Sequence, residues 1–301
     1  MSTTVTIGIS AYNENRNLGR LLAKLLSQKA LSFKLEKILV ISDGSTDDTA
    51  SVARSVSSSR IHVIEDKRRL GKALRMNQMF KTLRSDILVV VDADTDLEGM
   101  YVIEKLIKPF SVDRSIAMCN ALAKPLSGKT FTEKAVNHTY DTYLSILPKI
   151  KAGDSLFSVS GRMIAYRKAF VKKFKLPRNL IGTDAFTYFK CLSLGYKFKL
   201  VESAVVYFRS PVNLKDQIKQ NTRFVSRGDR LSKYFPKDLI SKESKIPSMI
   251  LIGSMASQLI KDPIKCIYIF LVNRYCYLLA KFYSANIKGG WEIARSTKIL
   301  R

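Results

Sequence analysis

The first hundred residues alternate short apolar runs with stretches whose apolar residues recur every three or four positions. The apolar runs predict buried β-strands at residues 5–10, 37–42, 61–64 and 87–91. The stretches between them predict helices at residues 13–28, 49–57 and 71–83. Strands that alternate with helices predict βαβ units, so we expect an α/β fold with a parallel sheet.

The second half of the chain has a less regular pattern. It predicts strands at residues 117–123, 164–166 and 199–208. It also predicts a helix at residues 184–194 that ends before Gly195, and a basic helical segment at residues 214–234.

The last sixty residues hold two apolar segments, 246–260 and 264–283. Each is too short or too often interrupted by charge, Pro or Gly to match the ~20 mainly apolar residues of a membrane span. At helical spacing, one stripe of the second segment is apolar, and it consists of Ile264, Ile267, Tyr268, Leu271, Tyr275, Leu278, Leu279 and Phe282. Arg274 and Lys281 fall on another stripe, so the segment predicts an amphipathic helix suited to a membrane interface. A helix that packs in a soluble core is the alternative.

Ligands of parallel α/β sheets bind beyond the carboxyl ends of the strands, which singles out loops 11–14, 43–49, 65–72 and 92–96. Tyr12 could stack on a base, and Glu14 could accept a hydrogen bond. Asp43 could accept from a base or ribose, although residues 45–48 could equally serve only as a turn and helix cap. Lys72 could bind a diphosphate or remain a simple surface lysine.

The stretch VVVDADTD ends a predicted strand in three closely spaced acids. Asp92 and Asp94 are two positions apart, so on a strand they share a side. Paired carboxylates beside phosphate-binding groups suit Mg²⁺ or Mn²⁺. We expect Asp96 to stand outside this pair and to begin a helix that Leu97 and Glu98 continue.

The net charge of +26 is unevenly distributed along the chain. Residues 1–140 contribute +6, whereas residues 141–301 contribute +20 with 30 Lys and Arg against 10 Asp and Glu. This excess predicts a polyanionic partner: nucleic acid, an anionic membrane or a phosphorylated substrate. The four Cys have no CxxC spacing, which argues against a zinc site and fits a reducing compartment, and residues 1–10 lack a secretory pattern.

The combined motifs resemble those of family-2 glycosyltransferases with the GT-A fold. The match covers roughly the first hundred residues and consists of 11–14 (AYNE), 43–49 (DGSTDDT), 70–73 (LGKA), Asn77 and 92–94 (DAD). The resemblance implies a mixed, mainly parallel sheet flanked by helices and a nucleotide-sugar donor. It also implies that Asp92 and Asp94 form the metal-binding DxD motif, with Asp94 as the direct ligand. The donor site that it implies further contains Ala11, Tyr12, Glu14, Asp43, Lys72 and Ala93.

The resemblance continues more weakly toward the C-terminus. Asp184 matches the family's catalytic base, with Thr183 in place of the usual Glu, while an ordinary helix N-terminal carboxylate is the alternative. The segment with Ser160, Gly161 and Arg162 resembles the acceptor side. Residues 220–224 (QNTRF) resemble QxxRW with Phe224 in place of Trp, which implies that Gln220 and Arg223 contact the donor diphosphate. Trp291 and residues 294–298 (ARSTK) also resemble C-termini of the family.

The expected function is therefore inverting, metal-dependent transfer of a sugar, from a UDP-sugar, to a lipid-linked or polysaccharide acceptor. We expect residues 1–230 to form the catalytic domain, with donor half 1–100 and acceptor half 101–230. Residues 231–301 are expected to form a basic amphipathic helical region that holds the enzyme at the cytoplasmic face of the membrane.

Two alternatives remain at this point. A nucleotidyltransferase would place a Gly-rich basic loop where residues 11–14 read AYNE. A nucleic-acid-binding protein would explain the basic charge, but acids cluster at the strand ends and no RNA-recognition, zinc-finger or helix-turn-helix pattern is present.

Overall fold

The computed structural model describes residues 2–178, 180–225, 231–283 and 295–300. The chain forms two compact units, one from residues 1–123, 159–208 and 298–301 and the other from residues 124–158 and 209–297. These units follow different boundaries from the predicted division at residue 230. The reason is that residues 124–158 leave the sheet-bearing unit and return to it, which a linear pattern does not reveal.

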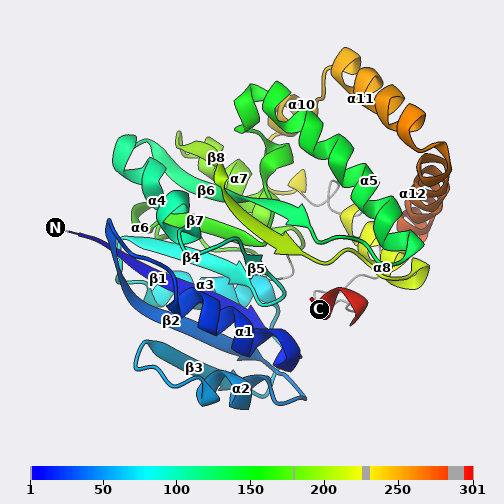
Figure 1. Cartoon of the computed structure of the whole chain (residues 1–301). Coiled ribbons are helices and arrows are strands. Elements are labelled where there is room, and N and C mark those ends of the chain that lie inside the picture. Colours follow the sequence, from blue (N-terminus) through cyan, green and yellow to red (C-terminus); the bar gives the residue numbers. More distant parts are fainter. Residues whose placement is uncertain (1, 179, 226–230, 284–294, 301) are drawn as a thin grey trace. The chain divides into compact units, whose positions relative to one another are not determined.

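The first unit is built on a mixed eight-stranded sheet (Figure 1). Its strand order is β3-β2-β1-β4-β7-β6-β8-β5. The strands are β1 Thr3–Ala11, β2 Phe33–Asp43, β3 Ile61–Asp66, β4 Ile87–Asp92, β5 Asp96–Leu97, β6 Ile116–Pro125, β7 Met163–Arg167 and β8 Lys197–Phe208. β1 pairs in parallel with β2 and β4, and β2 with β3, whereas β7 runs antiparallel to β4 and β6. The predicted mixed, mainly parallel α/β sheet is thus confirmed.

Six helices accompany this sheet in the described part of the first unit. They are α1 Asn15–Leu26, α2 Thr49–Ser55, α3 Lys72–Thr82, α4 Val102–Val112, α6 Lys168–Val171 and α7 Thr183–Ser193. The apolar stripe of α1 is fully buried through Leu18, Leu21, Leu22 and Leu25. Removal of these apolar side chains from water stabilises the packing of the amphipathic helix against the sheet. Each helix predicted in the first hundred residues is present, with ends shifted by one to two residues.

Asp96 does not begin a helix, so that prediction was wrong. Asp96 and Leu97 form β5, which pairs antiparallel with β8, and α4 begins only at Val102. The Asp96 side chain is buried and lies 2.5 Å from Nζ of Lys24 on α1. A strand partner more than a hundred positions away therefore overrides the local helix-start pattern.

The second unit is helical in its described residues. Its elements are α5 Phe131–Ile146, the 3₁₀ turns η1 Leu147–Lys149, η2 Lys151–Gly153 and η3 Leu156–Ser158, then α8 Leu214–Val225, α10 Lys237–Ser244, α11 Ser248–Lys261, α12 Pro263–Tyr283 and η4 Arg295–Lys298, whose Lys298 belongs to the first unit. α11 and α12 both contact α5, and α12 also contacts α8 (Figure 1). The first part of the helical segment predicted at 214–234 is present as α8, residues 226–230 lie outside the described residues, and Ser232–Tyr234 form a turn.

The predicted amphipathic helix at 264–283 is α12, but its apolar stripe points outward. Val272, Cys276 and Ala280 form its buried face, whereas Ile264 is 69% exposed and Leu271 is 60% exposed. The helix thus packs through Val272, Cys276 and Ala280, and the membrane contact predicted for its apolar stripe stays a prediction. Among the described helices, none combines the length and the apolar character that crossing a bilayer requires.

Candidate functional site

Three neighbouring parallel strands of the first unit end at one edge of the sheet. β1 ends at Ala11, β2 at Asp43 and β4 at Asp92, and the register pairs Ser10 with Asp92. Ala11, the last residue of β1, and Ala93, which directly follows β4, are buried and have small side chains. The predicted loops therefore meet at one edge.

The first two loops are braced against each other by hydrogen bonds. Asn13, in a left-handed conformation with φ of 53°, accepts from the backbone N–H of Thr46 at 2.8 Å. The backbone N–H of Glu14 donates to the hydroxyl of Thr49 at 2.8 Å. Asp47 accepts from the backbone N–H of Thr49 at 3.0 Å, which stabilises the turn before α2, whereas Asp48 at the N-cap position makes no side-chain capping hydrogen bond.

Asp43 fixes the loop that precedes α3. Its buried carboxylate accepts from the backbone N–H groups of Leu70 and Gly71, both at 2.8 Å, and from Nε of Arg75 at 2.6 Å. Arg75 is itself completely buried, so this pair is a hydrogen-bonded internal ion pair whose disruption is costly. The consequence is a fixed start for Lys72; the contact of Asp43 with a nucleoside stays a prediction.

Gly44 allows this loop packing, and its replacement should be strongly destabilising. Gly44 has a φ of +71°, and a Cβ there would lie 2.6 Å from the backbone N of Arg69. Gly195 has a similar φ of +75° but no neighbour within 4 Å, so it isolates the cost of the left-handed conformation. We expect Gly195→Ala to lower the free energy of unfolding by about 1 kcal/mol and Gly44→Ala by at least about 1 kcal/mol more. Equal losses in chemical denaturation would contradict this packing.

Asp92 and Asp94 lie beside a cluster of cations. Nζ of Lys72 pairs with Oδ1 of Asp92 and donates to the backbone oxygen of Gly161 at 3.0 Å. The pKa of Asp94 is raised by burial and by repulsion from Asp92, and attraction from Arg162, Lys298 and Lys72 opposes that rise. The pair therefore lies where one further cation would be stabilised strongly.

Gly161 lies close to Lys72, Asp92 and Asp184, which come from three different elements. A methyl group on Gly161 would lie 3.2 Å from Nζ of Lys72, 3.8 Å from Oδ2 of Asp92 and 3.9 Å from Cβ of Asp184. Asp184 is in the first turn of α7, directly after Gly182 in the left-handed region and the buried Thr183. The structure thus brings Asp184 next to the acidic pair, although about ninety positions separate them in sequence.

The segment before β7 is held in place by a buried amide and an aromatic ring. The backbone N–H of Ser160 donates to Oδ1 of Asn120, which is fully buried, at 3.2 Å. The guanidinium of Arg162 lies 3.5 Å from the centroid of the Phe208 ring. Ser160, Gly161 and Arg162 therefore lie in the segment that reaches Lys72 and Asp92, and their place on the acceptor side stays a prediction.

Two cations beside Tyr12 were missed in the sequence. Nζ of Lys298 lies 2.6 Å from Oε1 of Glu14 and also donates to the backbone oxygen of Tyr12. Burial and repulsion from Asp94 raise the pKa of Glu14 to about 7, whereas Lys298 lowers it. The guanidinium of Arg69 lies 4.0 Å from the Tyr12 ring centroid. The position of Arg69 in loop 65–72 was a signal that could have identified it as a site residue. Lys298 lies in residues 294–298, which the sequence analysis noted only as a resemblance. Trp291 and Ala294 lie outside the described residues.

The sequence model of glycosyl transferase family 2 matches residues 6–174. The chain belongs to this family. It is 25% identical over 229 residues to the poly-beta-1,6-N-acetyl-D-glucosamine synthase of Staphylococcus aureus (strain COL), covering 74% of this chain and 54% of that protein. It is 24% identical over 207 residues to the O-antigen chain rhamnosyltransferase RfbN of Salmonella typhimurium, covering 67% and 65%. The chain thus spans about half the length of the synthase.

Solved glycosyltransferase structures share the fold of this family-2 chain. The mannosyltransferase PcManGT from Pyrobaculum calidifontis, in complex with GDP-Man and Mn²⁺, superposes with a TM-score of 0.70 at 16% identity, covering 95% of this chain and 88% of that one. TarS 1-349 of S. aureus superposes with a TM-score of 0.54 at 14% identity, covering 95% and 91%. The glucosyl-3-phosphoglycerate synthase of Mycobacterium tuberculosis, with Mn²⁺ and UDP-Glc, gives 0.53 at 17% identity, covering 76% and 80%. These likenesses confirm the GT-A architecture.

The residues of this family-2 chain fit a divalent cation that phosphate oxygens of a ligand would help to hold. Among the described residues, no group of three or more His, Cys, Asp and Glu is arranged as a closed metal site. Asp92 and Asp94 instead offer carboxylate oxygens, and the ammonium of Lys72 already occupies one of them. Mg²⁺ and Mn²⁺ are commonly bound by one or two carboxylates plus phosphate oxygens, so the donor set suits such an ion.

Gln220 and Arg223 lie on α8, which belongs to the second unit. The Arg223 guanidinium is 5.5 Å from the ring centroid of Phe224. Their predicted contact with the donor diphosphate stays a prediction.

Proposed function

We propose that this chain transfers a sugar from a nucleotide sugar to an acceptor hydroxyl with inversion at the anomeric carbon, and that Asp184 is the catalytic base. The observation that carries the proposal is the convergence at Gly161 of Asp92, Lys72 and Asp184. This convergence joins a diphosphate-binding group, an acidic pair and a separate carboxylate within one small volume. Family membership favours glycosyl transfer over nucleotidyl transfer and over nucleic-acid binding.

The donor nucleoside would lie over loops 11–14 and 43–49. Tyr12 would stack on the base, and Glu14 and Asp43 would be its nearest carboxylates. Lys72 would exchange part of its contact with Asp92 for the donor diphosphate. We propose a UDP-sugar as donor; the structural relatives were crystallised with GDP-Man and with UDP-Glc, so a test must include both nucleotides.

Asp92 and Asp94, with Asp94 as the direct ligand, would hold Mg²⁺ or Mn²⁺ together with the diphosphate. The bound ion would act as a Lewis acid that neutralises charge on the departing diphosphate. Lys72 would contribute a second positive charge on the same side of the sugar.

The proposed reaction is a single displacement. Asp184 takes the proton from the acceptor hydroxyl as its oxygen forms a bond to the anomeric carbon. The bond from that carbon to the diphosphate oxygen breaks at the same time, and the nucleoside diphosphate leaves with the electron pair. General-base catalysis of this kind contributes about 10²–10⁴-fold. Ser160, Gly161, Arg162 and Thr183 would line the acceptor side.

The acceptor is proposed to be a lipid-linked sugar or a growing polysaccharide at the cytoplasmic face of the membrane. The basic charge of residues 141–301, +20, supports an anionic surface or phosphorylated acceptor. A curated relative is named as a synthase of a poly-N-acetylglucosamine, which agrees with a polymer acceptor.

Lys298 is expected to act as a positioning residue for the donor. Lys298→Met removes the cation that ties Glu14 and the Tyr12 backbone together, while keeping the side-chain length. We expect the KM for the donor to rise about tenfold, with a smaller change in kcat, because the Tyr12 ring that is proposed to stack on the base is no longer held in place. Lys298→Arg should restore most of the affinity. Steady-state kinetics on both variants checks this, and an unchanged KM in Lys298→Met would contradict it.

The proposed function is tested by a donor screen. Purified protein with Mn²⁺ is incubated with UDP- and GDP-linked glucose, N-acetylglucosamine, mannose and related sugars, and nucleoside diphosphate release is measured by chromatography. Release from one class of nucleotide sugar, faster with a matching acceptor, is the expected result. Release from none of them would contradict the proposal.

A further inference from the structure

Helix α11 of the second unit has its polar side inward and its apolar side outward. Its buried side chains are Ser254 and Gln258, each 6% exposed. Met249 and Ile260 are both 84% exposed, and Ile252 is 62% exposed. A helix stabilised by packing in water buries its apolar stripe, so this orientation requires an apolar cover on the outer side.

Helix α12 extends the same outward apolar surface. α11 contacts α12, and the two are joined at Asp262, so that Ile260 and Ile264 flank the turn between them. We call the outward side chains of the two helices the α11–α12 face, which consists of Met249, Ile252, Met255, Leu259, Ile260, Ile264, Ile267, Phe270, Leu271, Tyr275 and Leu278. Single exposed apolar residues are ordinary, but eleven on two contacting helices are not.

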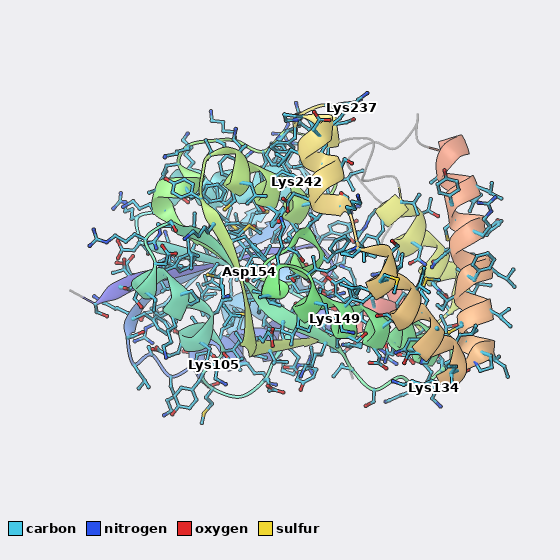
Figure 2. The ribbon with its side chains drawn as sticks, turned by 90° about the horizontal axis from the view of Figure 1, so that it is seen from above. Lys105, Lys134, Lys149, Asp154, Lys237 and Lys242 are labelled. Atoms are coloured by element: carbon cyan, nitrogen blue, oxygen red, sulfur yellow. The ribbon has the colours of Figure 1, made fainter. Side chains whose placement is uncertain are left out.

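The charges around the α11–α12 face are almost all positive. Residues 248–283 contain four Lys or Arg and one acid, Asp262, which is paired with Lys265 at 2.5 Å. The exposed Lys261 and Arg274 lie on the two helices themselves. The whole second unit carries 21 Lys and Arg against 9 Asp and Glu, and its exposed lysines include Lys134, Lys149, Lys237 and Lys242 (Figure 2).

We propose that the α11–α12 face docks on an anionic lipid bilayer, with its apolar side chains in the interface and its cations at the headgroups. Apolar burial plus attraction to anionic lipid is the combination that holds interfacial helices. A second copy of the chain fits less well, because a two-fold interface would bring together two copies of the same positively charged surface. The proposal concerns the second unit and is independent of the chemistry proposed for the first.

The test is flotation of the full chain with vesicles of phosphatidylcholine, with and without phosphatidylglycerol. We expect the wild type to float with phosphatidylglycerol vesicles, to bind pure phosphatidylcholine more weakly, and to lose part of its binding at high salt. The double variant Ile252→Ser/Ile260→Ser should lower the partition coefficient at least about tenfold. Leu31→Ser/Ile64→Ser removes two exposed apolar side chains from the first unit and should float like the wild type.

Absence of flotation by the wild type would overturn the proposal, as would equal flotation of the two double variants. A wild-type dimer that dissociates in Ile252→Ser/Ile260→Ser would also overturn it, since a second copy would then cover the face. Circular dichroism on each variant confirms that the fold is kept. Donor turnover is measured in parallel: flotation without turnover would contradict the proposed function alone, and turnover without flotation would contradict the docking surface alone.

Discussion

Asp184→Asn is expected to lower kcat about 10²–10⁴-fold while the affinity for the donor stays close to that of the wild type. Asparagine keeps the shape of the side chain at the start of α7 but accepts no proton from the acceptor hydroxyl. In the proposed site the donor is held by Lys72, the acidic pair and the loops after β1 and β2, so the substitution removes no proposed donor contact. Single-turnover kinetics and nucleotide titration measure the two quantities separately.

Glu202→Gln is the matched control for this variant. Glu202 is an exposed acid on β8 of the same unit, so its replacement removes one carboxylate without touching the site. It should leave kcat within about twofold of the wild type. If Asp184→Asn keeps wild-type turnover, Asp184 is not the base. If it loses donor affinity as strongly as turnover, its role is in binding.

Asp94→Ala is expected to remove the stimulation of nucleotide binding by Mn²⁺. Asp94 is half-buried, burial and repulsion from Asp92 raise its pKa, and a metal ion bound beside it would favour its charged form. Loss of a direct ligand should weaken Mn²⁺-dependent binding of the nucleoside diphosphate by at least about 10–100-fold. Titration calorimetry with and without Mn²⁺ gives the ratio directly.

Asp48→Asn serves as the control for Asp94→Ala. Asp48 is exposed and lies in the loop after β2, so it changes the local charge equally without offering a ligand at the β4 end. In Asp48→Asn, the ratio of the nucleoside diphosphate affinities with and without Mn²⁺ should equal that of the wild type. An unchanged ratio in Asp94→Ala would remove Asp94 from the metal shell and leave Asp92 as the carboxylate to test.

The first four strands and their loops could be predicted because each depends on neighbours in sequence. An apolar run of five or six residues is enough to specify a buried strand, and a parallel sheet then brings Ala11, Asp43 and Asp92 to one edge. The assignment of Asp184 to the site came from the resemblance to the family and not from the pattern of apolar and polar residues. Nothing local to Gly161 indicates that its backbone would contact Lys72 and approach Asp184.

The features that could not be predicted all depend on partners distant in sequence. Asp96 becomes a strand because β8 supplies a pairing edge, and Lys298 reaches Tyr12 across 286 positions. The outward stripe of α12 illustrates a further limit. A helix was predicted at residues 264–283 and α12 spans Pro263–Tyr283, but the pattern alone does not say which side faces the protein.

Sugar transfer at the Asp92–Asp94 pair is proposed to require a divalent cation, and turnover before and after chelation tests this requirement. Nucleoside diphosphate release from the preferred donor is measured with Mn²⁺, after removal of metal by EDTA, and after Mn²⁺ is added back in excess. The rate of nucleoside diphosphate release should fall at least about 10²-fold on chelation and recover when Mn²⁺ is restored. Full turnover in EDTA would contradict it.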